Sequence, residues 1–250
     1  SRLASLNPTP NLDALAKEGM IFDNAFVNNA ICVPSRAAII TGQQAQTNGV
    51  IDLEGSIAPE KQFLPKEMKK LGYQTAIVGK WHLHEEPAAF DYYKVLPSQG
   101  KYFDPEFRVR GDKPWTENVV QTKGHSSDNI MDITLDYLKN KRDPSKPFFL
   151  MHHFKAPHDD FEYAPRYEEY LTDTFIPEPE SLYEIGNHGS VGIRGKNDSL
   201  TRVIGSSVSH RNLIRNQAMN IYWKDSSIYK KYRNAKDIGQ EELVKWKMDA

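Results

Sequence analysis

Short apolar blocks along the chain alternate between the spacing of a helix and the spacing of a strand. The first helix is expected from Pro10, with Thr9 as its cap. Met20–Val27 follows with the composition of a strand. A tight connection is then expected at Cys32–Arg36, leading into a short helix at Ser35–Thr41. The chain therefore begins with a helix, a strand and a second helix.

The same alternation continues further along the chain. Pro65–Leu71 is expected to be a helix and Gln74–Val78 a strand, and a later helix begins at Ser126 or Ser127. Phe148–Phe154 is nearly continuous in apolar residues, which is typical of a buried strand in a parallel sheet. The repeated alternation predicts an α/β fold, with a largely parallel central sheet between layers of helices.

The region after Pro177 has a different character. Glycine and proline interrupt it repeatedly, and Asn and Ser are frequent. We expect a loop-rich insertion over residues 177–220, within a single domain to which all of residues 1–250 belong. Long loops in compact domains are usually functional, so we expect residues 186–216 to shape a ligand pocket.

Composition excludes several classes of protein. Lysine and arginine number 32 and acidic residues 33, which leaves a formal net charge of -1. Such balance gives no electrostatic reason to bind nucleic acid or an anionic membrane surface. No apolar run reaches the roughly 18–20 residues that a membrane-spanning helix needs. The single cysteine cannot close a disulfide within the chain.

Chemically capable side chains follow each of three expected strands. Cys32 and Arg36 follow the first, Lys80 and His82 the second, and His158 the third. Ligands of doubly wound sheets bind outside the carboxyl ends of the strands, so one pocket can collect all five side chains. Two fixed cations and two proton-exchanging histidines suit an anionic ester as substrate.

Taken singly, each of these residues also has an ordinary structural reading. A lone cysteine is often a small buried hydrophobe, Lys80 can be a solvated lysine, and His82 can be a structural histidine. Cys32 differs because it lies just before a helix N-terminus, which favours negative charge. His152 and His153 are expected to be mainly structural, and at most one faces the pocket, because neighbours in a strand point to opposite faces.

Three segments together resemble one enzyme family. Cys32–Arg36, followed by Thr41-Gly42, resembles the sulfatase signature Cys-x-Pro-Ser-Arg-x4-Thr-Gly. Gly79-Lys80-Trp81-His82 resembles the second sulfatase signature, and Phe148–His158, ending in Phe-Lys-Ala-Pro-His, resembles a third segment of the family. The resemblance runs from Thr9 to about Tyr183. It implies a formylglycine-dependent sulfatase with an alkaline-phosphatase-like fold, of which this chain is an N-terminal portion. The stretch from Pro147 to Tyr170 is most similar to bacterial N-acetylglucosamine-6-sulfatases and mucin-desulfating enzymes.

The resemblance implies a role for each candidate residue. Cys32 is oxidised to formylglycine by a formylglycine-generating enzyme or an anaerobic sulfatase-maturing enzyme, and its hydrate is the nucleophile. Arg36 holds the hydrated aldehyde, and Lys80 contacts the sulfate oxygens and the nucleophile. His82 is the base that releases sulfate from the covalent intermediate. His158 contacts the sulfate and helps to protonate the leaving oxygen.

The resemblance also implies a metal, a substrate and a location. The metal is Ca2+, with Mg2+ as an alternative; Cys32 as formylglycine is one ligand, and the other ligands lie outside this chain. The substrate is a sulfated saccharide, and the enzyme is expected in the periplasm or outside a bacterial cell. Two alternatives remain open: a phosphonate or phosphodiester hydrolase of the same superfamily, and a non-catalytic glycan-binding fragment.

Overall fold

The computed structural model describes residues 6–158 and 161–176 of the 250-residue chain. The expected loop-rich insertion at 177–220 lies outside the described residues, as does the stretch 186–216 that was expected to shape a pocket. Among the described helices, none combines the length and the apolar character that crossing a lipid bilayer requires.

The chain divides into two compact units. The first comprises Ser1–Gly124 and Asp128–His153, and the second comprises His125–Ser127 and Phe154–Ala250. The first unit holds the sheet and the greater part of the helices that the structure describes. In the second, residues 161–176 contain one short 3-10 helix, Pro165–Tyr167.

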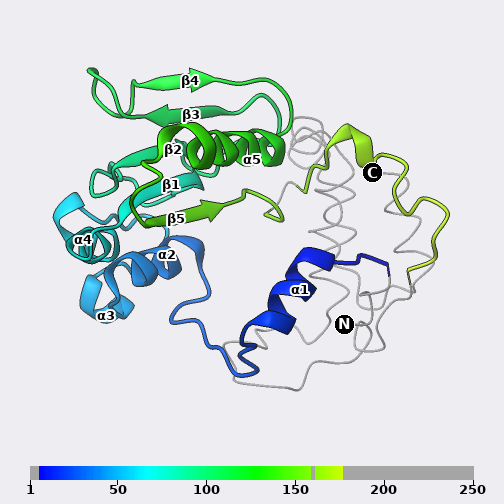
Figure 1. Ribbon diagram of the computed structural model, residues 1–250, viewed down its shortest axis with the longest axis horizontal. Helices are drawn as coiled ribbons and strands as arrows, with labels where there is room; N and C mark the ends of the chain where they lie inside the picture. The colour runs from blue at the N-terminus through cyan, green and yellow to red at the C-terminus, as the bar shows by residue number, and fades with distance from the viewer. Residues whose placement is uncertain (1–5, 159–160, 177–250) are drawn as a thin grey trace, which may run out of the picture. The chain divides into compact units, whose positions relative to one another are not determined.

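A five-stranded mixed sheet forms the centre of the first unit (Figure 1). Its strands are β1 (Gln74–Lys80), β2 (Tyr92–Leu96), β3 (Glu106–Val109), β4 (Val119–Gln121) and β5 (Phe148–His153). Their order is β4-β3-β2-β1-β5, with β1 parallel to both β2 and β5. The strands β3 and β4 extend the sheet as antiparallel neighbours. The parallel part therefore matches the expectation, whereas the β3–β4 edge makes the whole sheet mixed.

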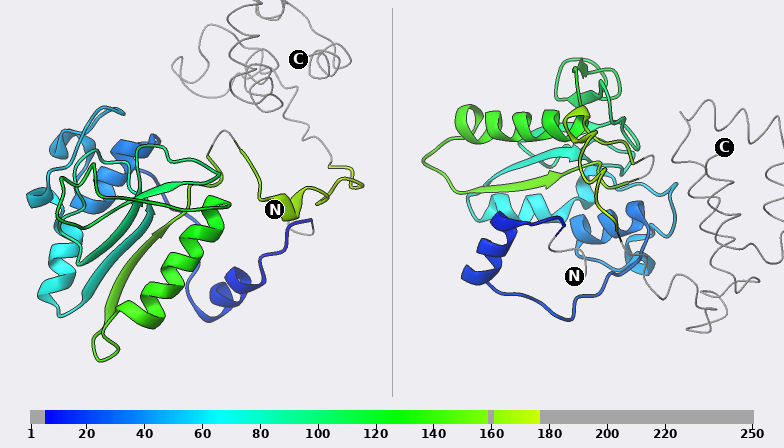
Figure 2. Two further views of the ribbon diagram at one scale, coloured as in Figure 1. Left: turned by 90° about the horizontal axis from the view of Figure 1, so that it is seen from above. Right: turned by 90° about the vertical axis from the view of Figure 1, so that its right-hand side faces the viewer.

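Helices cover both faces of this sheet (Figure 2). The described helices are α1 (Pro10–Glu18), α2 (Cys32–Thr41), α3 (Ala45–Asn48), α4 (Phe63–Lys70) and α5 (Ser126–Asp136), with a π-helical turn at Tyr137–Lys141 and 3-10 turns at Pro59–Lys61 and Pro165–Tyr167. Helix α1 buries no residue and does not belong to the layers on the sheet. In the right-hand view of Figure 2, α5 lies on one side of the strands, and α2 and α4 lie on the other.

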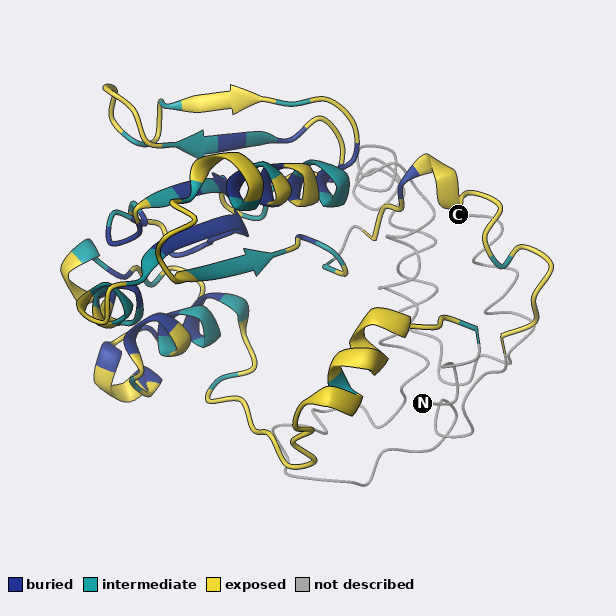
Figure 3. Ribbon diagram, viewed as in Figure 1, coloured by how far each residue is buried: buried dark blue, intermediate teal, exposed yellow. Residues whose placement is uncertain are grey.

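The alternation of side chains along β1 divides the core into two clusters. Ile77 packs with residues of α2, including Val33 and Ile40, in the larger cluster. Its neighbour Val78 packs with Ile130 and other residues in the smaller cluster. Successive residues of a strand point to opposite faces, so each face of β1 receives its own helix layer. Figure 3 shows β1 as buried along nearly its whole length.

Two sequence-based expectations of strands need correction. Met20–Val27 forms neither helix nor strand, and Phe26 is 92% exposed. Among the described residues no strand pairs with this stretch. Without a partner strand, its backbone N–H and C=O groups cannot form the hydrogen bonds of a sheet. The expected strand Phe148–Phe154 ends at His153 and is half-buried rather than buried. It pairs with β1 alone among the described strands, so only one of its flanks is covered.

Candidate active site

Helix α2 begins at Cys32 itself, so the tight connection expected at Cys32–Arg36 is instead the first turn of a helix. The first helical hydrogen bond runs from the Ser35 N–H to the Ile31 carbonyl, over 2.9 Å. Pro34 fits the third position of the helix, because the first four N–H groups of a helix have no intrahelical acceptor. The signature cysteine therefore lies where free backbone amides favour negative charge.

The Thr-Gly pair of the signature ends the same helix. The Thr41 hydroxyl donates to the Ala37 carbonyl over 2.6 Å and accepts from the Gln43 N–H over 3.2 Å. Gly42 has a left-handed backbone with φ of 66°, and its N–H donates to the Ala38 carbonyl. Glycine adopts this conformation without steric cost. Thr41 and Gly42 therefore end α2, the helix that carries Cys32 at its start.

Arg36 connects α2 to the sheet. It lies one helical turn after Cys32, on the same face of α2. Its Nη1 donates to the Lys80 carbonyl over 2.6 Å and lies 3.0 Å from Nδ1 of His153. Burial lowers the pKa of Arg36 from its ordinary value, and the neighbouring Cys32 opposes that change. Arginine remains charged throughout the physiological range, so a fixed cation lies beside the cysteine.

Lys80 is the last residue of β1, and its side chain is 2% exposed. The reading of Lys80 as a solvated lysine is therefore wrong. Its ammonium donates to Oε1 of Gln99, which follows β2 by three residues. Sequence reasoning missed Gln99, although it follows a parallel strand just as Lys80 and His82 do. Searching every strand end for polar side chains would have found it.

The chain turns sharply after Lys80. Gly79 has φ of 96°, and a Cβ atom there would collide with the carbonyl oxygen of His153 on β5. His82 also has a positive φ, of 54°, and its residue is buried. Between them, the Trp81 indole N–H donates to the Glu85 carbonyl over 2.7 Å. The glycine of the second signature thus permits close contact of β1 and β5, and the turn holds His82 near Lys80.

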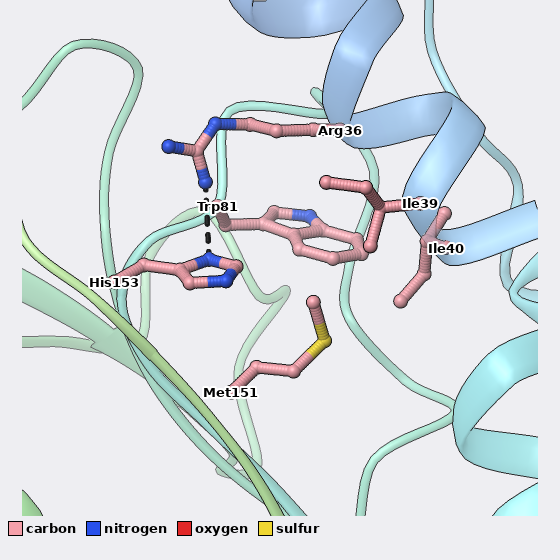
Figure 4. A pocket seen from close by; sticks show the side chains of 6 residues that line it. All are labelled: Arg36, Ile39, Ile40, Trp81, Met151 and His153. Carbon is pink, nitrogen blue, oxygen red and sulfur yellow. Dashed lines mark hydrogen bonds between the residues drawn. The ribbon is translucent and has the colours of Figure 1, made fainter. Parts of the chain in front are cut away.

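A small hollow lies beside the Arg36 guanidinium (Figure 4). It is lined by Arg36, Ile39, Ile40, Trp81, Met151 and His153. Burial, and after it the Arg36 charge, lower the pKa of His153 to about 4, so its ring is neutral at pH 7. The sequence had indicated that at most one of His152 and His153 faces the pocket. His153 lines this hollow, whereas Nδ1 of His152 lies 2.8 Å from Oγ1 of Thr134.

The convergence of the five side chains on one pocket stays a prediction, although Arg36 connects the two segments that carry four of them. Cys32, Arg36, Lys80 and His82 come from the start of α2 and the end of β1. His158 belongs to the second unit, where its N–H donates to the Lys155 carbonyl over 3.1 Å, and its approach to Cys32 stays a prediction.

The described residues contain no group of three or more His, Cys, Asp or Glu side chains that could hold a metal ion. Ca2+ binds about 6–8 oxygen ligands, so this part of the chain does not by itself fit a calcium site.

Comparison with known proteins gives consistent results. The Sulfatase family model matches residues 4–235. The chain is 41% identical over 183 residues to an N-acetylglucosamine-6-O-sulfatase of Bacteroides thetaiotaomicron, covering 72% of this chain and 32% of that protein. It is 29% identical over 196 residues to the N-acetylglucosamine-6-sulfatase of Homo sapiens, covering 70% of this chain and 35% of that protein.

One solved structure is of a protein in complex with its substrate D-glucosamine-2-N,6-O-disulfate. It matches 97% of this chain and 47% of its own, at 33% identity and a TM-score of 0.69. The chain thus spans about a third of the length of the two curated relatives and about half of the solved one. This similarity confirms the expected alkaline-phosphatase-like α/β fold. With three signature segments in order and a family match over nearly all of its length, the chain belongs to the sulfatase family.

Proposed function

We propose that this chain is part of the catalytic domain of a sulfuric ester hydrolase that removes sulfate from a sulfated sugar. The observation that carries the proposal is the position of Cys32 at the start of α2, one turn from the half-buried cation Arg36. Arg36 in turn contacts the backbone carbonyl of Lys80, whose side chain is a buried cation. Cations near the nucleophile suit a substrate whose negative charge spreads over sulfate oxygens, and in this proposal the Lys80 ammonium joins Arg36 in that role.

The proposed chemistry uses Cys32 after its oxidation to formylglycine. One hydroxyl of the hydrated aldehyde attacks sulfur and displaces the sugar alcohol. The second hydroxyl then loses its proton, sulfate leaves, and the aldehyde is restored. A serine or an unmodified cysteine lacks this second hydroxyl, so its sulfate ester would need a fresh attack at sulfur.

The remaining residues have distinct proposed roles. Arg36 holds the hydrated aldehyde, and Lys80 contacts the sulfate oxygens. His82 removes the proton that triggers sulfate release, and His158 contacts the sulfate and helps to protonate the leaving sugar oxygen. His82 is buried, as Lys80 is, and follows it by two residues in a sharp backbone turn, which supports roles for both residues in one site.

The proposed substrate class follows from the relatives. Two relatives are N-acetylglucosamine-6-sulfatases by name, and one similar structure was solved with D-glucosamine-2-N,6-O-disulfate as its substrate. A glucosamine carrying sulfate at the 6-position is therefore the first compound to assay. Ca2+, with Mg2+ as the alternative, is the metal that the family implies, and elemental analysis would identify it. Periplasmic or secreted location and a formylglycine-forming partner enzyme belong to the same proposal.

The experiment uses the complete gene product that contains this chain, made in a host with a maturing enzyme. Peptide mass spectrometry measures the formylglycine content at Cys32, and turnover is measured on paired aryl sulfate and aryl phosphate esters. Turnover should favour sulfate, rise with formylglycine content and disappear in Cys32→Ala. Full activity with unmodified Cys32 would contradict the mechanism, and a preference for phosphate esters would favour the phosphodiester alternative.

His82→Ala provides the sharper test of the release step. Loss of a general base typically costs ~10²–10⁴-fold in rate, so turnover should collapse while substrate still binds. Sulfated protein should then accumulate and be visible as added mass on the Cys32 peptide. Normal turnover would mean that His82 is structural, and retained sugar binding without turnover in the unsubstituted protein would identify a glycan-binding fragment.

A further inference from the structure

We propose that His153 is a positioning residue that fixes the Arg36 guanidinium beside Cys32. The proposal rests on the function proposed above, because Arg36 acquires a catalytic role only there. His153 lies at the end of β5, far along the chain from α2 and outside the residues to which the sulfatase signatures give a role.

Three atoms form a tight triangle at this point. Nη1 of Arg36 lies 2.6 Å from the Lys80 carbonyl oxygen and 3.0 Å from Nδ1 of His153. Nδ1 and the Lys80 oxygen are themselves 3.1 Å apart. Nη1 carries two hydrogens, so it can donate to both neighbours at once. Nδ1 then acts as an acceptor, and the imidazole carries its proton on Nε2.

The opposite tautomer is disfavoured by the same geometry. A proton on Nδ1 would point to the Lys80 carbonyl, but it would leave the Arg36 N–H group facing another donor only 3.0 Å away. A doubly protonated ring would add a second positive charge beside the guanidinium. The lining of the hollow, which includes Ile40, Trp81 and Met151, is mainly apolar and offers no acidic group to offset that charge.

Fixing Nη1 from two sides fixes the plane of the guanidinium. Figure 4 shows Nη1 directed at the imidazole, while the other guanidinium nitrogens of Arg36 point away from it. Those remaining N–H groups are the ones left to meet a ligand at Cys32. Misplacing a catalytic group by about 1 Å can cost on the order of 100-fold in rate, so the acceptor that holds Arg36 matters to turnover.

The chain supplies a matched control next to the tested residue. His152 precedes His153 in the same strand but contacts Thr134 on the other face of the sheet. Three variants of the complete gene product are compared on an aryl sulfate. His153→Phe keeps the ring volume without the acceptor, His153→Asn keeps an acceptor oxygen near the Nδ1 position, and His152→Phe makes the same change on the other face.

The expected result is a kcat about 10–100-fold lower in His153→Phe, with KM changed far less. His153→Asn should recover most of this loss, and His152→Phe should stay within about 2-fold of the unsubstituted protein. Thermal unfolding of each variant shows whether the fold is kept. Equal kcat in folded His153→Phe, or no recovery in His153→Asn, would overturn the proposal.

A second readout does not depend on activity. Nitrogen-15 NMR of the histidine rings should show His153 neutral and protonated on Nε2, and the Arg36 N–H signals should broaden in His153→Phe but not in His152→Phe. A proton on Nδ1 would overturn the positioning role. A protein that hydrolyses no sulfate ester, yet gives these NMR signals, would contradict the proposed function and leave the contact between His153 and Arg36 established.

Discussion

Two adjacent histidines at the end of β5 have the same side chain but different surroundings. His152 approaches the Thr134 hydroxyl, and His153 approaches the Arg36 guanidinium. Burial lowers the pKa of both, and for His153 the adjacent cation adds to the effect and brings the pKa to about 4. A single step along the strand thus separates a histidine beside a hydroxyl from a histidine beside a charge.

The lowered pKa of His153 predicts sensitivity to acid. Between its folded value of about 4 and the ordinary value of 6.5, the unfolded chain binds a proton that the folded chain does not. The contribution of His153 to stability should therefore fall as pH drops from about 7 to 4, by at most on the order of 3 kcal/mol, and change no further below that range. Urea unfolding at several pH values measures this loss.

The matched variant isolates the contribution of His153. In His153→Asn the slope of stability against pH should be shallower across the same range, because that residue no longer titrates. His152 also has a lowered pKa, but it is present in both proteins and cancels from the difference. Identical pH slopes in the two proteins would mean that His153 does not resist protonation.

A second residue-scale prediction concerns Gln62, which is fully buried before α4. Its amide donates to the carbonyls of Ile57 and Glu86, and its oxygen accepts from the Ala89 N–H. Gln62→Leu would leave these buried backbone groups without partners, so it should cost roughly 2–4 kcal/mol in the free energy of unfolding. Chemical denaturation measures the loss.

Gln74 provides the control for that substitution. Its amide also bonds to backbone carbonyls, at Asp143 and Lys146, but these contacts are exposed to solvent. Water can replace them, so Gln74→Leu should cost less than about 1 kcal/mol. Equal losses at the two positions would show that burial does not decide the cost.

At the scale of elements, the pairing of β1 with β5 depends on Gly79. Its φ of 96° is unfavourable for other residues, and a Cβ would also meet the His153 carbonyl. Gly79→Ala should therefore lower stability by more than about 2 kcal/mol and weaken turnover through displacement of Arg36 and His153. Gly72 has a similar φ of 85° but open space around it, so Gly72→Ala should cost only about 1 kcal/mol. Chemical denaturation measures both losses, and equal losses in Gly79→Ala and Gly72→Ala would contradict a steric clash at Gly79.

The sequence predicted the central strand correctly, but it also predicted a strand that does not form. Gln74–Val78 was predicted to be a strand, and β1 contains it, because a buried run bounded by turn residues is a strong local signal. Met20–Val27 has a similar composition, yet it is an exposed loop among the described residues. Strand formation depends on a partner, and the pairing of distant segments cannot be found from local composition.

The same limit applies to the candidate site. The segments carrying Cys32, Arg36, Lys80 and His82 could be singled out because they form short motifs, although only Lys80 and His82 lie at the end of a strand. The contact of Arg36 with His153 could not, because 117 residues separate the two in the chain. Nor could the burial of Lys80 be predicted, since it depends on the loop that brings Gln99 to it.

At the scale of the whole molecule, the two sheet edges differ in the described residues. β4 has three exposed residues, whereas β5 is six residues long and rich in apolar side chains. A long apolar edge strand is a template for pairing with another chain. We therefore expect the 250-residue chain, made by itself, to self-associate as concentration rises. Analytical ultracentrifugation would show a shift to larger species.

One edge substitution tests which strand is responsible. Phe148 is 41% exposed at the start of β5 and lies beside the Arg142 guanidinium. Phe148→Glu places a charge on that edge and should reduce self-association, because charged edge residues oppose strand pairing. Val119→Glu makes the equivalent change on β4 and should have little effect. Unchanged sedimentation in Phe148→Glu would exclude β5 as the contact.

The distance along the chain between Arg36 and His153 has a consequence for biosynthesis. At ~5–20 residues per second, a ribosome needs about 6–23 s to add the 117 residues that separate them. Throughout that interval Cys32 has left the synthesis site while the strand that holds Arg36 in place does not yet exist. The maturing enzyme that the proposed function requires would therefore have a window of seconds in which its target is an unfolded peptide, and the rate of translation would set the length of that window.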